Sequence, residues 1–331
     1  MSLFYTSEGP GNWQNFVKRS DIKNLPVLEQ KRKYLTEQLQ FEDFISQQLH
    51  LLQVARFQQT QAQGGSVDSE PGGYVFADKS ALSTAVGEWN NDEAAATLTY
   101  GDINTWDVSA VTDMSQMFQF SGFNSDISNW DVSNVTNMSQ MFYFDPAFNQ
   151  DISSWNVSNV TNMSNMFNNV ADFNQDLSSW DVSSVTNMSN MFTEVMFFNQ
   201  DLSSWDVSSV TNMSAMFKLT GLPGDISNWD VSNVTDMSFM FEGNSSMNSY
   251  TSNLGNWDVS SVTTMYNMFA GVELLTTTYD AILIGWAAQT LQSSVPFYGG
   301  SSLYSAGAAA TARGVLTGAP NSWTITDGGQ V

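Results

Sequence analysis

Cysteine is absent from the 331 residues, and histidine occurs once, as His50. The missing thiols exclude disulfide frameworks, thiolate zinc sites and cysteine nucleophiles. A single histidine removes the common arrangements in which histidine binds a metal or acts as a catalytic base. Basic residues are also few, with 10 Lys and Arg against 33 Asp and Glu. The net charge of −23 argues against nucleic acid and anionic membrane surfaces as direct partners.

Long apolar runs are missing as well. No run approaches the ~18 residues that a transmembrane helix needs. The first residues lack the basic start and apolar stretch of a secretory signal, so we expect export, if it occurs, to use another route. Apolar residues nevertheless make up 42% of the chain, which is enough for a hydrophobic core.

The scarce basic residues are concentrated near the N-terminus. Residues 1–64 hold seven basic and six acidic side chains, whereas the rest of the chain holds three basic and 27 acidic ones. The change falls next to Gly64-Gly65, in a stretch rich in Gly and Ser that has the composition of a flexible linker. The sequence therefore predicts an N-terminal segment over 1–64 and a linker over 65–73.

The acidic part contains an internal repeat. Seven tryptophans follow one another at spacings of 24, 25, 25, 25, 24 and 28 residues, and a Met-Phe pair follows each at the same spacings. A unit of this size cannot bury its own apolar side, so neighbouring units must stack into a continuous core. Apolar positions two or three residues apart match neither a long helix nor a long strand. We therefore expect stacked coils with one very short strand each, at the ~4.8 Å strand spacing.

The tryptophans and methionines of the repeat are predicted to fill this core. They include Trp130, Trp155, Trp180, Trp205, Met141, Met166, Met191 and Met216. An exposed platform that stacks on sugars is the alternative for the tryptophans. Soft-metal binding is the alternative for the methionines, although one Met beside Phe in every coil is typical of core filling.

Two series of aspartates also repeat. They are Asp102, Asp126, Asp151, Asp176, Asp201 and Asp225, and Asp107, Asp131, Asp181, Asp206, Asp230 and Asp258. Stacking would bring like charges within about 5 Å, at a cost of about 1 kcal/mol per pair in water. Bridging Ca²⁺ would relieve the repulsion, and the weak calcium candidates are Asp151, Asp176, Asp201 and Asp225. The alternative is that each carboxylate accepts N–H bonds of its own turn, because calcium needs six to eight oxygens. No cofactor is predicted.

The core of the unit, Trp-Asp-Val-Ser-Asn-Val-Thr-Asn-Met-Ser-x-Met-Phe, resembles the repeats of BspA-like bacterial surface proteins, which are relatives of leucine-rich repeats. The resemblance covers residues 101–272, with residues 74–100 similar to the family's N-terminal cap and 279–327 to its C-terminal end, and we predict a C-terminal cap over 273–331. It implies an α+β, leucine-rich-repeat-like solenoid of about seven coils with short parallel strands, capped at both ends. Family members are largely adhesion or interaction proteins, so the resemblance implies no catalytic residues.

Local patterns support regular structure in both flanks. A strand at 74–76 and a helix that begins after Asp78 are predicted before the repeat. After the repeat, helices are predicted over 279–291 and 305–316, and short strands at 297–298 and 323–325. An insertion at 243–253 is predicted to be a bulged surface loop.

Residues 26–62 differ in kind from the repeat. Pro26 is placed at a helix start, where its missing N–H costs nothing. An apolar stripe then consists of Leu28, Leu35, Leu39, Ile45, Leu49 and Leu52. A helix of about 36 residues gains stability mainly by packing, so we expect it to self-associate or to dock on another structural protein. Folding back on the repeat is the alternative.

These features favour a non-enzymatic recognition protein. The serines are repeat positions with no histidine beside them, and no carboxylate pair is placed for acid–base work. Because no secretion signal or wall anchor is visible, we expect a virion-attached fibre, spike or decoration protein. Residues 1–64 would hold it on the virion, and the acidic solenoid would contact a protein or glycan of the host surface. The alternatives are a bacterial cell-surface adhesin and an intracellular protein-binding scaffold.

Recognition in a repeat protein depends on positions that vary between units. The variable segments are Phe144-Asp145-Pro146, Asn168-Asn169-Val170, Thr193-Glu194-Val195 and Lys218-Leu219-Thr220. We expect the ligand to bind among them.

Overall fold

The computed structural model describes residues 23–27, 29–31, 33–34, 73–221 and 223–331, and the chain divides into two units, 1–71 and 72–331. In the first unit a helix begins at Val27, and the N–H groups of Glu29 and Gln30 donate to the Pro26 carbonyl at 2.9 and 3.0 Å. The predicted helix start at Pro26 is therefore confirmed. The predicted apolar stripe lies outside the described residues: Leu28, Leu35, Leu39, Ile45, Leu49 and Leu52.

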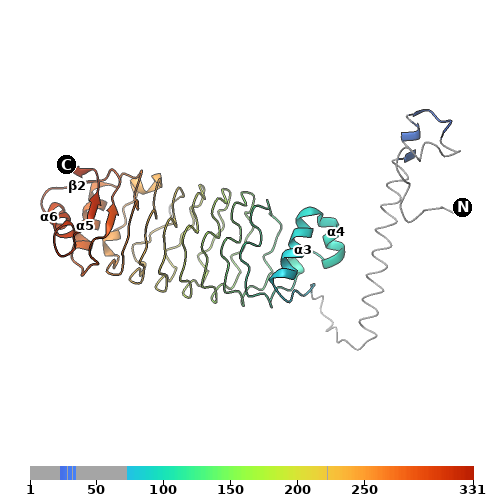
Figure 1. Ribbon diagram of the computed structural model, residues 1–331, viewed down its shortest axis with the longest axis horizontal. Helices are drawn as coiled ribbons and strands as arrows, with labels where there is room; N and C mark the ends of the chain where they lie inside the picture. Colours follow the sequence, from blue (N-terminus) through green and yellow to red (C-terminus); the bar gives the residue numbers. More distant parts are fainter. Residues whose placement is uncertain (1–22, 28, 32, 35–72, 222) are drawn as a thin grey trace. The chain divides into compact units, whose positions relative to one another are not determined.

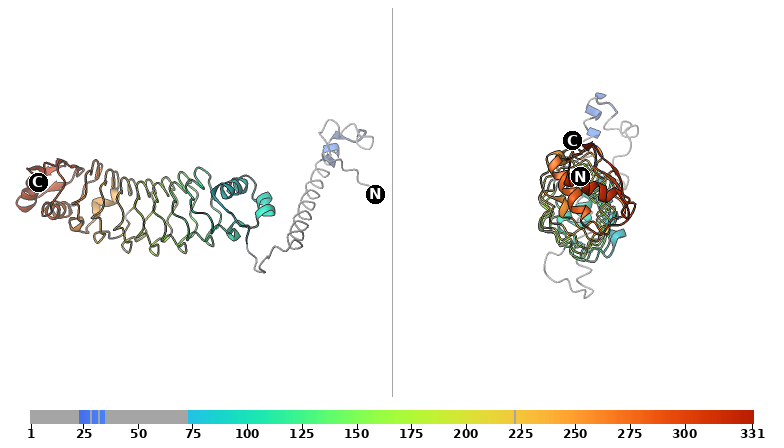
Figure 2. Two further views of the ribbon diagram at one scale, coloured as in Figure 1. Left: turned by 60° about the horizontal axis from the view of Figure 1, so that its bottom comes forward. Right: turned by 90° about the vertical axis from the view of Figure 1, so that its left-hand side faces the viewer.

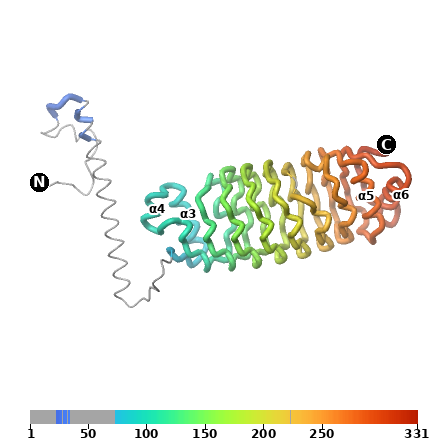
Figure 3. Tube along the Cα trace, turned by 180° about the vertical axis from the view of Figure 1, so that it is seen from behind, coloured from blue at the N-terminus to red at the C-terminus, as the bar shows by residue number. Residues whose placement is uncertain are grey.

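The second unit consists mainly of irregular coils that stack in a row (Figure 1). We call residues 103–272 the coil array. One residue of each coil pairs in parallel with the next coil, and these residues are Asp113, Asn137, Asn162, Asn187, Asn212, Asp236 and Thr264. The chain runs through the row in sequence order, so each coil lies between its predecessor and its successor (Figure 3).

Five backbone hydrogen bonds join neighbouring coils in this row, and one of them is donated by the later coil, as from the Thr161 N–H to the Thr136 carbonyl at 2.9 Å. In the second coil the N–H groups of Met138, Gln140, Phe142 and Phe144 donate to carbonyls of the third coil at 2.9–3.0 Å. Between them the chain makes tight turns, such as the bond from the Met141 N–H to the Met138 carbonyl at 3.2 Å. Alternate N–H groups can point to the same neighbour because Gln140 and Phe144 have left-handed backbones, with φ of 57° and 53°. The coil therefore bends without losing its bonds to the next coil.

The interior of the array repeats the same apolar side chains in every coil. In the second coil these are Trp130, Val132, Val135, Met138, Met141 and Phe142, all of them buried. The phenylalanine rings stack from coil to coil, with 5.3 Å between the centroids of Phe118 and Phe142 and 5.7 Å between those of Phe142 and Phe167. Successive coils overlie one another when the row is seen along its length (Figure 2). A continuous core therefore runs through the array.

Two helices cover the N-terminal end of the array, α3 (Lys79–Asn91) and α4 (Glu93–Tyr100), followed by η1 (Ile103–Thr105). The Asp78 carboxylate accepts the Ala81 N–H at 2.9 Å, which satisfies one of the free donors at the start of α3. The predicted helix after Asp78 is thus confirmed. Its buried side chains are Leu82, Ala85, Val86 and Trp89. The second helix, α4, was not predicted.

The C-terminal end contains α5 (Thr276–Ala287), β1 (Pro296–Tyr298), β2 (Leu303–Tyr304), α6 (Ala308–Thr317), β3 (Thr324–Thr326) and β4 (Gly329–Gln330). These elements confirm the predicted helices and short strands after the repeat to within a few residues. Met265 forms a bridge with Phe297 of β1, and β1 pairs in parallel with β3. Parallel pairing therefore continues beyond Val272 into the predicted C-terminal cap. A separate parallel pair joins β2 and β4.

The insertion at 243–253 is a surface loop only in part, because Asn244, Met247 and Tyr250 are buried while five of its other residues are exposed. It forms η2 (Ser245–Ser249) and is followed by η3 (Leu254–Asn256). Met247 and Leu254 are fully buried, and the Tyr250 hydroxyl accepts the Ile226 N–H at 3.1 Å. The extra residues supply core side chains, because their apolar members point inward and replace the usual repeat positions.

None of the helices in the described ranges has the length and apolarity that crossing a bilayer requires.

Candidate interaction surface

The predicted core residues all lie inside the array. Trp130, Trp155, Trp180 and Trp205 are 3–4% exposed, and Met141, Met166, Met191 and Met216 are fully buried. Each tryptophan donates its indole N–H to a carbonyl of the preceding coil, as Trp180 does to Ile152 at 3.1 Å and Trp205 to Leu177 at 2.9 Å. These indole rings are therefore covered, and they offer no face on which a sugar could stack.

The calcium candidates Asp151, Asp176, Asp201 and Asp225 are exposed. Each accepts the backbone N–H of the serine two residues later at 2.9–3.0 Å. Backbone and hydroxyl bonds from Ser153 lower the pKa of Asp151, and Ser178 acts in the same way on Asp176. Across the described residues, no group of three acidic or histidine side chains is arranged to hold a metal ion. The carboxylates are thus engaged in their own turns.

A hollow of about 210 Å³ lies between the N-terminal helices and the first coil. Its lining includes Trp89, Glu93, Phe123 and Asn124, and the Trp89 indole N–H donates to the Ser125 hydroxyl at 3.0 Å. Glu93 is the single ionisable group among the lining residues. The hollow therefore contains no pair of groups for acid–base chemistry.

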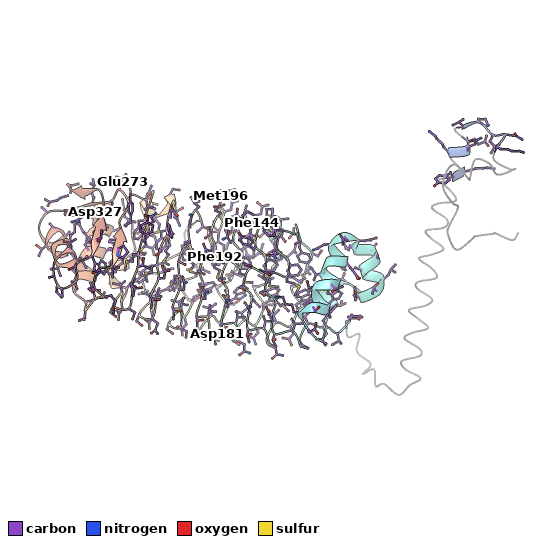
Figure 4. The ribbon with its side chains drawn as sticks, viewed as in Figure 1. Phe144, Asp181, Phe192, Met196, Glu273 and Asp327 are labelled. Atoms are coloured by element: carbon purple, nitrogen blue, oxygen red, sulfur yellow. The ribbon has the colours of Figure 1, made fainter. Side chains whose placement is uncertain are left out.

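Variation between coils is concentrated at the bend that follows the Met-Phe pair. We call this surface the corner strip. In the first five coils it comprises 119–122, 143–147, 168–172, 193–197 and 218–221. Figure 4 shows Phe144 and Met196 of the strip on one long edge of the array, Asp181 on the opposite edge and Phe192 between them. The variable positions of five successive coils therefore share one edge.

The second position of the strip has a left-handed backbone in every coil. The residues there, in coil order, are Phe120, Phe144, Asn169, Glu194, Leu219, Gly243 and Gly271, with φ between 51° and 75°. This conformation costs a residue with a Cβ on the order of 1 kcal/mol, and glycine avoids the cost. Phe120, Phe144 and Leu219 are also 65%, 42% and 41% exposed. Three coils thus have a large apolar residue at this second position, although glycine fits the left-handed backbone better and the side chain stays largely exposed.

Three aromatic rings form an exposed cluster on the strip. The ring centroids of Phe120 and Phe144 are 5.5 Å apart, those of Phe120 and Tyr143 are 5.4 Å apart, and those of Tyr143 and Phe144 are 4.7 Å apart. Further along the strip, Met196 and Phe197 are 64% and 66% exposed. Exposed aromatic and methionine side chains of this kind are enriched in protein interfaces.

A buried carboxylate, Asp145, directly follows Phe144 of the aromatic cluster in the sequence. One oxygen of Asp145 accepts the Ser121 hydroxyl and the Phe123 N–H, each at 2.9 Å, and joins the first two coils. Burial raises the pKa of Asp145, although the bonds from Ser121 and from backbone N–H groups act in the opposite direction. Asp145 therefore fixes the bend that presents Phe144 rather than contacting solvent itself.

A charged pair lies near the other end of the strip. The Lys218 ammonium is 2.7 Å from a Glu242 carboxylate oxygen in the next coil and 5.7 Å from the centroid of the Phe239 ring. Lys79 and Arg313 are likewise paired, with Asp113 and Asp327. These are the three basic residues after residue 64, so every cation of this acidic part is neutralised by a neighbouring carboxylate.

The four variable segments predicted from the sequence all lie on the corner strip. Sequence reasoning missed Phe120, Met196 and Phe197, which belong to the same surface. The signal was present in the spacing, because Phe120 precedes Phe144 by the same 24 residues that separate Trp106 from Trp130.

The sequence matches the model of one protein family. No curated protein and no solved structure matches the chain. Residues 89–202 and 196–297 both match the model of a family described as "Mycoplasma protein of unknown function, DUF285". The two matches together span the coil array and more than half of the sequence, and the chain belongs to this family.

Proposed function

We propose that this protein is a non-enzymatic attachment protein, a virion fibre, spike or decoration protein that presents its acidic array to a host surface. The observation that carries the proposal is the corner strip, because a uniform scaffold there holds different exposed side chains on one edge. Repeat proteins use extended surfaces of this kind for recognition. The array would be a leucine-rich-repeat-like solenoid, capped by the elements on either side of it.

The division of the chain into two units supports a separate role for the N-terminal segment. We assign residues 1–64 to assembly, either with other copies or on another structural protein. The charge contrast supports this assignment, because the segment is nearly neutral and the array repels other copies of itself.

A bacterial cell-surface adhesin is the second candidate. The family description favours it, because it refers to mycoplasma proteins, and the repeat resembles that of BspA-like surface proteins, to which this family is related. Mass spectrometry of purified virions and surface labelling of intact bacterial cells separate the two candidates, since each places the chain on a different particle.

The solution mass tests the assembly role directly. We expect the full chain to be a trimer or higher oligomer, and a chain beginning at Ser66 to be a monomer. If both are monomers in isolation, residues 1–64 are not a self-association device, and the fibre model fails in favour of docking on a different protein.

A further inference from the structure

The exposed apolar residues at the second position of the corner strip are not needed to build the coil. The sixth and seventh coils place Gly243 and Gly271 at the position of Phe120 and Phe144, with the same left-handed backbone. The third coil has Asn169 there, and asparagine tolerates this conformation well. The fold therefore accepts small residues at a position where two coils carry exposed phenylalanine.

Strained backbone under an exposed side chain is a feature of functional sites. Phe120 and Phe144 have both a left-handed backbone and an exposed side chain, and their rings contact Tyr143 instead of the core. The cluster has a tyrosine hydroxyl as its single polar group. It therefore suits an apolar side chain of a protein better than the hydroxyl groups of a sugar, which need several hydrogen-bond partners.

The charge of the strip indicates whether the protein partner is acidic or basic. Glu194 occupies the same position as Phe144 two coils later, and Asp172 lies on the strip between them. Neither has a basic partner among the described residues, whereas Lys218 is neutralised by Glu242. An acidic partner would be repelled by the array, and a basic one would be attracted.

Spacing links the apolar and acidic parts of the strip. Two coil steps of about 4.8 Å separate Phe144 from Glu194, a distance of about 10 Å. An extended peptide rises about 3.3 Å per residue and alternates its side chains between two faces, so residues two or four positions apart, about 7 or 13 Å, can both face the strip. A segment lying along the strip can thus contact the aromatic cluster with one side chain and Glu194 with another.

We propose that the corner strip binds an extended segment of a basic protein, which places an apolar side chain on the Phe120–Tyr143–Phe144 cluster and a Lys or Arg beside Glu194. The proposal rests on the proposed attachment function and names the class of its partner.

A random peptide library displayed on phage, selected against the full chain, tests this assignment. We expect the selected sequences to share an apolar residue and a basic residue two or four positions apart, because these spacings put both side chains on one face of an extended peptide. A synthetic peptide of the shared sequence should lose at least tenfold in affinity when Phe144→Gly or Glu194→Gln is introduced. Replacing its basic residue by Glu should abolish binding, and Glu194→Lys should restore binding to that changed peptide.

Two controls separate recognition from folding. Asp181→Asn, on the opposite edge of the array, should change the affinity less than twofold. Phe144→Gly and Phe144→Asn should shift the melting temperature by less than about 3 °C, because neither strain nor burial favours the native ring. A collapse of stability in both variants would overturn the proposal, since the ring would then be structural.

The proposal is also overturned if no sequence is enriched, or if the selected peptides bind the Phe144 and Glu194 variants unchanged. Attachment of the whole protein to its target surface is measured in parallel. Attachment that survives both substitutions removes the corner strip as the site and leaves the proposed function intact. If the chain binds the selected peptide but does not attach to the target surface, the corner strip is a peptide-binding site and the proposed attachment function is wrong.

Discussion

At the scale of single residues, Asp145 shows how the array accommodates a charged group in its interior. Other coils place Val170 and Val195 at the same position, and both valines are fully buried. Asp145 is equally buried, and its carboxylate accepts the Phe123 N–H at 2.9 Å, whereas the other acceptor of this N–H, the Ser121 hydroxyl, is 3.3 Å away. The same burial raises its pKa. One oxygen of this carboxylate therefore joins the first two coils, while burial opposes the charge of the group.

Asp145→Asn should make the protein less sensitive to pH. A carboxyl group whose pKa is raised by folding contributes stability below the ordinary aspartate pKa of about 3.9, and this contribution is lost as the pH rises through the raised value. The amide keeps an acceptor oxygen and does not titrate. We expect the free energy of unfolding of the variant, relative to the native chain, to increase from pH 3 to pH 7 in urea titrations.

A matched change at the same site separates charge from hydrogen bonding. Asp145→Val copies the third and fourth coils but removes the closer acceptor of the Phe123 N–H and leaves it only the Ser121 hydroxyl at 3.3 Å. Neither variant titrates at this site, so we expect Asp145→Val to be about 1–3 kcal/mol less stable than Asp145→Asn at every pH, because the valine leaves a buried donor without a good acceptor. If Asp145→Asn and the native chain instead keep a constant difference from pH 3 to pH 7, the raised pKa is wrong.

At the scale of elements, the C-terminal end depends on one enclosed ion pair. The Arg313 guanidinium of α6 contacts both carboxylate oxygens of Asp327, at 2.8 and 3.2 Å, and the Tyr279 hydroxyl of α5 donates to the same carboxylate at 2.9 Å. The Asp327 side chain is 3% exposed. This carboxylate thus ties α5, α6 and the end of β3 together.

Arg313→Ala should destabilise the C-terminal end strongly. Removing one partner of a buried pair leaves the other charge uncompensated and costs about 3–5 kcal/mol. Arg313→Lys keeps the charge but loses the two-point contact, so it should cost less. Urea unfolding of both variants measures the difference, and a loss below about 1 kcal/mol for the alanine variant would contradict this account of the pair.

The sequence predicts some elements better than others. Elements with local signals are predictable, whereas those that depend on contacts between distant residues are not. The helix after Asp78 was predictable because its cap and its apolar face are local signals. Helix α4 is short and alanine-rich, and its cap Asp92 directly follows α3, so no pattern separated the two. Trp286 of α5 donates to the Leu254 carbonyl at 3.0 Å and continues the tryptophan series inside a helix, where the regular spacing no longer identified it.

The interaction surface was predictable in part. Differences between repeat units indicated four of its segments without any structure. Its geometry was not predictable, because residues such as Phe144 and Leu219 do not favour the left-handed backbone that exposes them. Only the bonds between coils impose that conformation. Local propensity therefore gave no sign that Phe120 and Phe144 would share an exposed edge.

At the scale of the whole molecule, one edge of the array carries like charges in successive coils. Asp176 and Asp181 keep lowered pKa values through their bonds to serine, although the carboxylates of Asp151 and Asp206 in adjacent coils act against this. Repulsion between exposed charges is screened by salt. The array should therefore be more stable at high ionic strength.

Removal of divalent cations should leave the melting temperature unchanged. The aspartates already accept N–H bonds of their own turns, so Ca²⁺ would have to compete for oxygens that are in use. Thermal unfolding with EDTA, with CaCl₂ and with NaCl at matched ionic strength distinguishes a bound ion from screening. A drop of several degrees with EDTA alone would restore the calcium interpretation.

The bonds between coils have a consequence for the reach of this molecule. The same five backbone bonds recur at all six junctions between the seven coils, so a contact point on the edge can be moved only by whole coils. Distances along the edge between contact points in different coils are therefore multiples of the spacing between neighbouring coils. Duplication or loss of a single 25-residue unit between Phe144 and Glu194 would change their separation by about 4.8 Å and leave both ends of the molecule unaltered. Gain or loss of whole coils would therefore adapt the strip to partner segments of different length, with no change within the remaining coils.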